Sequence, residues 1–171
     1  KVGEILEKQK DIEVIYTRKT DVFVELRQRG NIANKAKADL FVSIHANAYN
    51  GTEALGTETF VMGTSKNASH LEVAKRENAV ITLEDDYEIK YEGFDPNKPE
   101  TLIGLTLLQD QYIAQSIDLA SRLQTKFTYD LNRRNRGVKQ APFLVLHSVF
   151  MPSVLVELGF ISNQSEGKYL D

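Results

Sequence analysis

The chain has 171 residues, which is enough for one domain with a substantial core. Its 21 basic residues nearly balance its 24 acidic ones and form no basic block, so nucleic-acid binding is not favoured. The absence of cysteine excludes disulfides and thiolate metal ligands. No apolar run approaches the roughly 18 residues that a membrane-spanning helix needs.

The first half of the chain predicts alternating helices and strands. Residues 1–8 have one apolar helical face but no capping residue before it, so we expect the chain to begin inside a helix, with at least one element upstream. Thr20 or Asp21 is expected to cap the next helix, and a β-α-β crossover around that helix predicts a parallel pair of strands. The expected elements in this half are helices at 1–8, about 21–36 and 67–78, and strands at 11–17, 40–46 and 56–62.

The second half opens with a long acidic segment, residues 82–100, which ends in an Asp-Pro-Asn-Lys-Pro sequence. It is long for a connection inside a compact domain, and it predicts either a solvated insertion or a lid or regulatory segment over the site. Helices and strands alternate along the chain, which predicts the α/β class with a largely parallel sheet. The remaining expected elements are a helix from about residue 101, a turn at 135–137, and short strands at 143–146 and 153–159.

Two of these apolar strands each carry one catalytic-type residue near the carboxyl end, His45 and Glu157. In open α/β sheets, ligands collect at the carboxyl ends of the strands. An unpaired, ionised carboxylate is costly to bury, so a metal-bound water or a substrate is expected to face Glu157. His45 is then a neutral imidazole ligand, and Glu157 is a general base whose pKa burial raises toward the working range.

Structural interpretations of both residues remain open from the sequence alone. His45 can be a core histidine that a neighbouring carbonyl satisfies, and Glu157 can form an ion pair with Arg136 or Lys139. Gly159 is expected to leave room for close approach beside the carboxylate, and His147 can line the same cleft. The chain lacks a Gly-x-Ser-x-Gly elbow, a P-loop and a Gly-x-Gly-x-x-Gly fingerprint, so a serine nucleophile and nucleotide binding have no support.

Seven segments of the chain occur in the order expected of one known family. They are Thr17-Arg-Lys-Thr-Asp21, Leu26-Arg-Gln-Arg29, Ala33-Asn34, Ala38-Asp-Leu-Phe-Val-Ser-Ile-His-Ala-Asn47, Gly56-Thr-Glu-Thr-Phe60, Asn135-Arg-Gly-Val-Lys-Gln-Ala141 and Pro152-Ser-Val-Leu-Val-Glu-Leu-Gly-Phe-Ile-Ser-Asn163. Together they strongly resemble the zinc-dependent N-acetylmuramoyl-L-alanine amidases of the amidase-3 type, which trim bacterial peptidoglycan.

The resemblance implies a phosphorylase/hydrolase-like fold of three layers, with a largely parallel, twisted sheet between helices. It implies a single catalytic domain over 1–171 that cleaves the amide between N-acetylmuramic acid and L-alanine. One zinc ion, two histidine ligands, a glutamate ligand and a separate glutamate base are expected. His45 matches a ligand and Glu157 matches the base, and Asn47 and Arg136 are expected contacts for the sugar or the stem peptide.

The family's first histidine ligand and its glutamate ligand belong upstream of Lys1, so the resemblance predicts a domain that is incomplete at its amino terminus. Residues 82–108 occupy the place of a helical plug found in some members, which predicts a regulatory insertion released by an activator protein. Because the substrate is peptidoglycan, the expected location is the periplasm or the cell exterior, and we expect a monomer.

Two other functions remain open from the sequence. One is a related zinc amino- or carboxypeptidase on a similar sheet. The other is a binding module that has kept an amidase scaffold but lost its metal. Activity on glycan-linked muropeptide rather than free peptide separates the first from an amidase, and a metal assay identifies the second.

Overall fold

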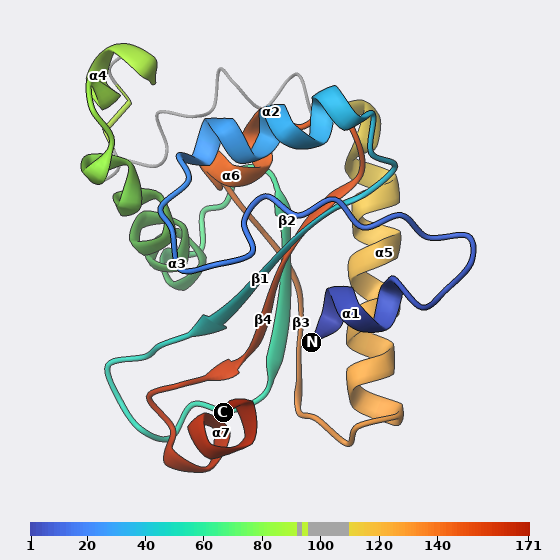
Figure 1. Cartoon of the computed structure of the whole chain (residues 1–171). Coiled ribbons are helices and arrows are strands. Elements are labelled where there is room, and N and C mark those ends of the chain that lie inside the picture. Colours follow the sequence, from blue (N-terminus) through green and yellow to red (C-terminus); the bar gives the residue numbers. More distant parts are fainter. Residues whose placement is uncertain (92–93, 96–109) are drawn as a thin grey trace.

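The computed structural model describes residues 1–91, 94–95 and 110–171 (Figure 1). Within these residues, no helix has both the length and the apolar character needed to cross a membrane. The elements in chain order are α1 (Val2–Leu6), α2 (Leu26–Ala36), β1 (Phe41–Asn47), β2 (Thr57–Met62), α3 (Ala68–Asn78), the 3-10 helix η1 (Ala79–Leu83), α4 (Tyr87–Lys90), α5 (Asp110–Tyr129), β3 (Asn135–Ala141), α6 (Leu144–His147), β4 (Ser153–Phe160) and α7 (Gln164–Leu170).

The four strands form one sheet in the order β1-β4-β2-β3. β1 pairs in parallel with β4, and β2 pairs in parallel with β3, whereas the central pair of β2 and β4 is antiparallel. The α/β class is therefore confirmed, and the sheet is mixed rather than uniformly parallel. Since β4 is an interior strand, its residues are covered by neighbours on both edges.

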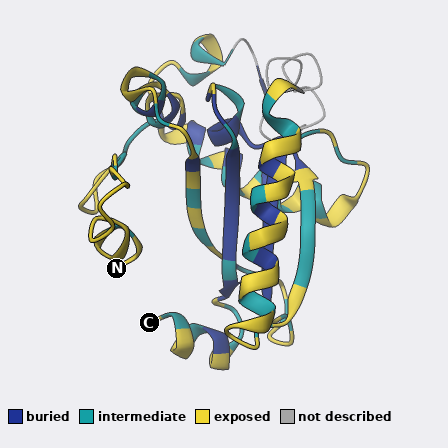
Figure 2. Cartoon of the chain, turned by 90° about the vertical axis from the view of Figure 1, so that its right-hand side faces the viewer, coloured by how far each residue is buried: buried dark blue, intermediate teal, exposed yellow. Residues whose placement is uncertain are grey.

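Helices cover both faces of the sheet, as predicted. On one face, α5 packs its apolar stripe against Val61, Val154 and Val156. On the other face, α2, α3 and α6 pack against Phe60 and Leu155. Figure 2 shows α5 with its exposed residues turned outward, next to the buried central strands. Because side chains alternate along β2 and β4, each strand contributes residues to two separate cores, one on each face of the sheet.

The prediction of a strand at 11–17 is wrong, because these residues form no strand in the structure. Ile12 and Ile15 are both more than 40% exposed, so the alternating pattern has no core to face. The expected β-α-β pair between 11–17 and β1 is therefore wrong as well. β1 finds its parallel partner in β4 instead.

The helix expected from Thr20 or Asp21 begins at Leu26, and neither residue caps it. The Leu26 N–H donates instead to Glu84, a buried carboxylate in the acidic segment. This contact ties the beginning of that segment to the start of α2. The part of the segment at 92–93 and 96–108, and the expected helix start near residue 101, lie outside the described residues.

Two further predictions fail in the second half of the chain. The apolar run 143–146 was expected to be a strand but forms α6, because a short run buried on all sides has no period that separates strand from helix. Residues 135–137, expected to be a turn, open strand β3. The turn signal came from Gly137, whose φ of +89° belongs to a bulge inside the strand.

Candidate metal and catalytic site

The register of the sheet brings His45 and Glu157 together. The two residues are direct partners in the parallel pair of β1 and β4. Side chains at paired positions of neighbouring strands point to the same face, so both project from one side of the sheet. Their ligand-type atoms lie within 4.8 Å of each other and of a third group, Glu77. The predicted convergence of the imidazole and the carboxylate on one position is confirmed.

Glu77 is a member of the site that the sequence reasoning missed. It lies in the last turn of α3, and its Oε2 is 2.7 Å from Nδ1 of His45. Asn78, the next residue, holds this end of the helix, since its side chain donates to the Pro142 carbonyl and accepts from the Leu144 N–H. One feature of the sequence could have pointed to Glu77. A carboxylate in the last turn of a helix interacts unfavourably with the helix dipole, so its presence there suggests another role.

Glu157 is fully buried and lacks a hydrogen-bond partner on either oxygen within the described part of the chain. Burial, and then the charges of Glu77 and Glu58, raise the pKa of Glu157 from 4.5 to about 8. The alternative of a structural ion pair with Arg136 or Lys139 is wrong, because both cations bind Glu58. A carboxyl group in these surroundings can exchange a proton near neutral pH.

His45 and Glu77 form a coupled pair beside Glu157. Burial alone would raise the pKa of Glu77, but the hydrogen bond and charge of His45 and the neighbouring Arg76 outweigh it and lower that pKa. The other ring nitrogen of His45, Nε2, lies 3.1 Å from the Ser43 hydroxyl. The imidazole thus faces a carboxylate and a hydroxyl, which differs from a core histidine satisfied by a carbonyl.

The donor set fits a zinc ion. Imidazole nitrogen and carboxylate oxygen are both normal zinc ligands, and three such groups, His45, Glu77 and Glu157, meet at one place. The two partnerless oxygens of Glu157 point to the same requirement, since a buried carboxylate needs a cation or a proton. Additional ligands upstream of Lys1 stay a prediction, and this chain itself brings a second donor, Glu77, next to His45.

Asn47 and Arg136, the predicted substrate contacts, both lie beside this cluster and share Glu58 as a partner. Asn47 is 2% exposed, and its side-chain oxygen also accepts from Arg76. Arg136 is partly exposed and stacks over the Phe160 ring. Their contact with substrate stays a prediction, and Arg136 is the more accessible of the two.

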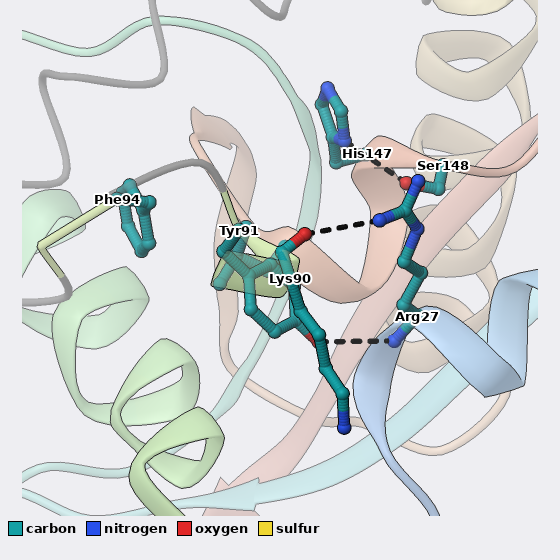
Figure 3. A pocket seen from close by; sticks show the side chains of 7 residues that line it. Arg27, Lys90, Tyr91, Phe94, His147 and Ser148 are labelled. Atoms are coloured by element: carbon teal, nitrogen blue, oxygen red, sulfur yellow. Dashed lines mark hydrogen bonds between the residues drawn. The ribbon is translucent and has the colours of Figure 1, made fainter. Parts of the chain in front are cut away.

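Two other residues were expected to border the cleft. The space beside Gly159 is taken by Glu166 and Arg133, whose side chains come within 3 Å of where a Cβ would stand, so it serves protein packing rather than a ligand. His147 lines a pocket with Arg27, Lys90 and Tyr91 (Figure 3). None of the three cluster residues lines that pocket, so His147 borders a different hollow.

Comparison with known proteins identifies the family of this chain. The family model described as N-acetylmuramoyl-L-alanine amidase matches residues 1–171. The amidase AmiC of Escherichia coli O6:H1 is 31% identical over 99% of this chain and 40% of its own length. The amidase AmiA of Escherichia coli K12 is 32% identical over 93% of this chain and 54% of its own length. The chain therefore spans about half the length of these curated relatives.

Solved structures support the same grouping. The N-acetylmuramoyl-L-alanine amidase of Clostridium difficile 630 superposes with a TM-score of 0.64 at 28% identity, covering 96% of this chain and 64% of that one. The fold match and the family match extend over the same residues, including the strands that carry His45 and Glu157. This chain belongs to the N-acetylmuramoyl-L-alanine amidase family.

Proposed function

We propose that this protein hydrolyses the amide bond between N-acetylmuramic acid and the L-alanine of the peptidoglycan stem peptide, with zinc as its metal. One observation carries the proposal: a buried carboxylate without a partner among the described residues, Glu157, faces a histidine and a second carboxylate in a member of the amidase family. His45 and Glu77 are the proposed zinc donors of this chain, and Glu157 is the proposed general base.

The chain's own residues supply the proton transfers. When bound, zinc supplies Lewis-acid chemistry that makes water acidic and polarises a carbonyl. Glu157 receives the proton of the attacking water on one of its free oxygens, and it then gives that proton to the departing alanine nitrogen. Burial raises the pKa of Glu157, which makes its carboxylate a better proton acceptor than an ordinary glutamate. Arg136, partly exposed at the border of the cluster, is the proposed contact for a polar group of the substrate.

The proposal places the protein in the cell envelope, in the periplasm or at the cell exterior, since that is where peptidoglycan lies. The cluster of His45, Glu77 and Glu157 favours the amidase over the two other functions left open by the sequence. A binding module that has lost its metal has no need for three donor groups within 4.8 Å of one another. A peptidase that needs a free peptide terminus differs in substrate, and that difference can be measured.

The test uses the full-length protein, loaded with zinc, on purified peptidoglycan sacculi and on the free stem peptide. We expect new L-alanine amino termini from sacculi and no cleavage of the free peptide. Glu157→Gln should retain zinc and lose roughly 10²–10⁴-fold in kcat, the usual contribution of a general base. Glu72→Gln, an exposed glutamate on the helix that carries Glu77, is the matched control. Cleavage of the free peptide alone would identify a peptidase instead.

We also propose that residues 82–108 regulate this site and that an activator protein releases them. The support is continuity with the site, because Glu77 is followed by Asn78 and then by η1, which runs into the segment. Beyond η1, Glu84 accepts from the Leu26 N–H, and Lys90 pairs with Glu25 at 2.6 Å, so the segment is fastened to α2.

Replacement of residues 96–108 by a glycine-serine linker of equal length tests this regulatory role. We expect a higher basal rate on sacculi and an unchanged zinc content. The linker keeps the Glu84 and Lys90 contacts to α2, so it leaves that part of the fold in place. A basal rate equal to that of the unaltered protein would assign the segment to a passive insertion.

A further inference from the structure

Two buried carboxylates face each other across the central strands of the sheet. Glu58 on β2 and Glu157 on β4 are direct partners in the antiparallel pair, and their exposed fractions are 2% and 0%. Like charges directly opposite each other destabilise a sheet. The pair is tolerated here because the two groups have very different surroundings.

Glu58 accepts hydrogen bonds from three side chains. It accepts from the Asn47 amide at 2.7 Å, from Nε of Arg136 at 3.1 Å, and from Nζ of Lys139 at 2.5 Å. Glu157 has no donor among the described residues. Arg136 and Lys139, two cations of the neighbouring strand β3, are thus both held by the carboxylate across from Glu157.

A bulge in β3 makes this arrangement possible. Thr57 and Thr59 on β2 pair with Asn135 and Val138, so a step of two residues on β2 faces a step of three on β3. In a regular strand, positions three apart such as 136 and 139 point to opposite faces. The extra residue, with Gly137 at a positive φ, re-aims the strand so that Arg136 and Lys139 both reach Oε2 of Glu58.

Lys139 acts electrostatically on Glu157. The charges of Arg76 and then Lys139 lower the pKa of Glu157, against the larger effect of burial. The ammonium is mostly buried and lies over the Phe60 ring. A lysine paired with Glu157 would occupy the oxygens that the proposed base needs for its proton.

We propose that Glu58 is a positioning residue, which retains Lys139 and Arg136 and so keeps Glu157 free to act. This inference rests on the proposed role of Glu157 as general base. Glu58 itself touches neither the proposed metal position nor the reacting atoms. It acts by binding Lys139 and Arg136, so that neither cation forms an ion pair with Glu157.

The direct test is a crystal structure of Glu58→Gln, which needs no activity. Without the Glu58 charge, Lys139 should turn so that Nζ lies within salt-bridge distance of a Glu157 oxygen, about 4 Å or less. Lys139 remaining in its present position would overturn the proposal. This readout does not depend on whether Glu157 is the base, so it separates failure of this inference from failure of the proposed function.

The kinetic test is a double-mutant comparison in the full-length, zinc-loaded protein. We expect Glu58→Gln to lower kcat roughly 10–100-fold with little change in KM, because the base is blocked rather than removed. Adding Lys139→Met to Glu58→Gln should restore at least about tenfold of that loss, because no lysine is left to pair with Glu157. A merely structural role of Glu58 predicts the reverse, with the second change adding to the loss.

Lys139→Met alone completes the test and covers a Glu58→Gln protein that does not fold. Glu58 then keeps Asn47 and Arg136 as partners, so folding is retained. Because Lys139 is held away from the chemistry in this scheme, its replacement should leave kcat within about threefold. A loss of tenfold or more would show that the lysine acts on the substrate and would overturn the proposal.

Discussion

Two buried glutamates, Glu166 and Glu157, carry the same chemical group in opposite surroundings. Glu166, in α7, pairs with Arg133 at 2.6 Å and accepts from the N–H groups of Gly56 and Phe160. Glu157, on the strand before it, has no partner among the described residues. Both oxygens of Glu166 are used to fasten α7 to the sheet, whereas the oxygens of Glu157 stay available for a metal, a water or a substrate.

The comparison shows how burial can serve either stability or chemistry. We call Glu166, Arg133 and Tyr169 the α7 clamp, because the Arg133 guanidinium pairs with Glu166 and lies over the Tyr169 ring. A buried ion pair with extra hydrogen bonds is costly to break but does no chemistry. A buried carboxylate without a partner weakens the fold and is available for proton transfer.

Loss of an ion pair in the α7 clamp should change the free energy of unfolding most. Glu166→Gln should lower the free energy of unfolding by roughly 3–5 kcal/mol, because it leaves the buried Arg133 charge without a carboxylate partner. Urea unfolding followed by circular dichroism measures the change. The exposed Glu72→Gln should stay within about 0.5 kcal/mol of the unaltered protein. A Glu166→Gln protein as stable as this control would show that the pair is not structural.

Replacing Glu157 by glutamine should raise, rather than lower, the free energy of unfolding. In the metal-free protein at pH 8, Glu157→Gln should raise the free energy of unfolding by roughly 2–4 kcal/mol, because it removes the cost of ionising a buried carboxyl group. Urea unfolding in the presence of a zinc chelator measures it. Destabilisation by this change at pH 8 would mean that the carboxylate has a stabilising partner.

This gain should depend on pH in a defined window. The pKa of Glu157 is raised from 4.5 to about 8 in the folded protein, so the folded state holds the proton more tightly than the unfolded state. The free energy of unfolding of the unaltered protein should therefore fall as pH rises from 4.5 to 8. The advantage of Glu157→Gln should shrink toward zero as the pH is lowered to 4.5, and unfolding at several pH values checks this.

Zinc affinity should depend on Glu77, whereas the α7 clamp has no part in metal binding. Glu77→Gln should weaken zinc affinity by at least about tenfold, since it replaces a charged donor beside His45 with a neutral amide. Competition with a chromogenic zinc chelator measures the affinity, and Glu72→Gln on the same helix is the control. Equal affinities would place Glu77 outside the metal site.

Loss of the helix caps of α7 and α3 should change the free energy of unfolding least. Asn163→Ala should cost about 1 kcal/mol, since the Asn163 side chain accepts from the N–H groups of Ser165 and Glu166 at the start of α7. Asn67→Ala, which removes the cap of α3, should cost about the same. Only Asn67→Ala should also weaken zinc binding, because α3 carries Glu77. Equal zinc affinities in both variants would mean that the far end of α3 holds Glu77 in place by itself.

The parts of the fold that the sequence predicted well are those with a strong local pattern. The apolar runs of β1 and β4, the helix α3 and the stripe of α5 were all located from spacing and composition. The failures lie where the pattern was ambiguous or needed a partner. Residues 11–17 alternate like a strand but pair with none, and 143–146 are apolar on every side, so neither period applies.

For the site, the chemical types could be predicted from the sequence, since an imidazole and a carboxylate each lie within an apolar strand and such groups are costly to bury. Which residues contact one another depended on the three-dimensional fold. It paired His45 with Glu157 through the strand register, brought Glu77 in on α3, and used the β3 bulge to give both cations to Glu58. These contacts join segments that are far apart along the chain, and local periodicity carries no information about which distant segments become neighbours.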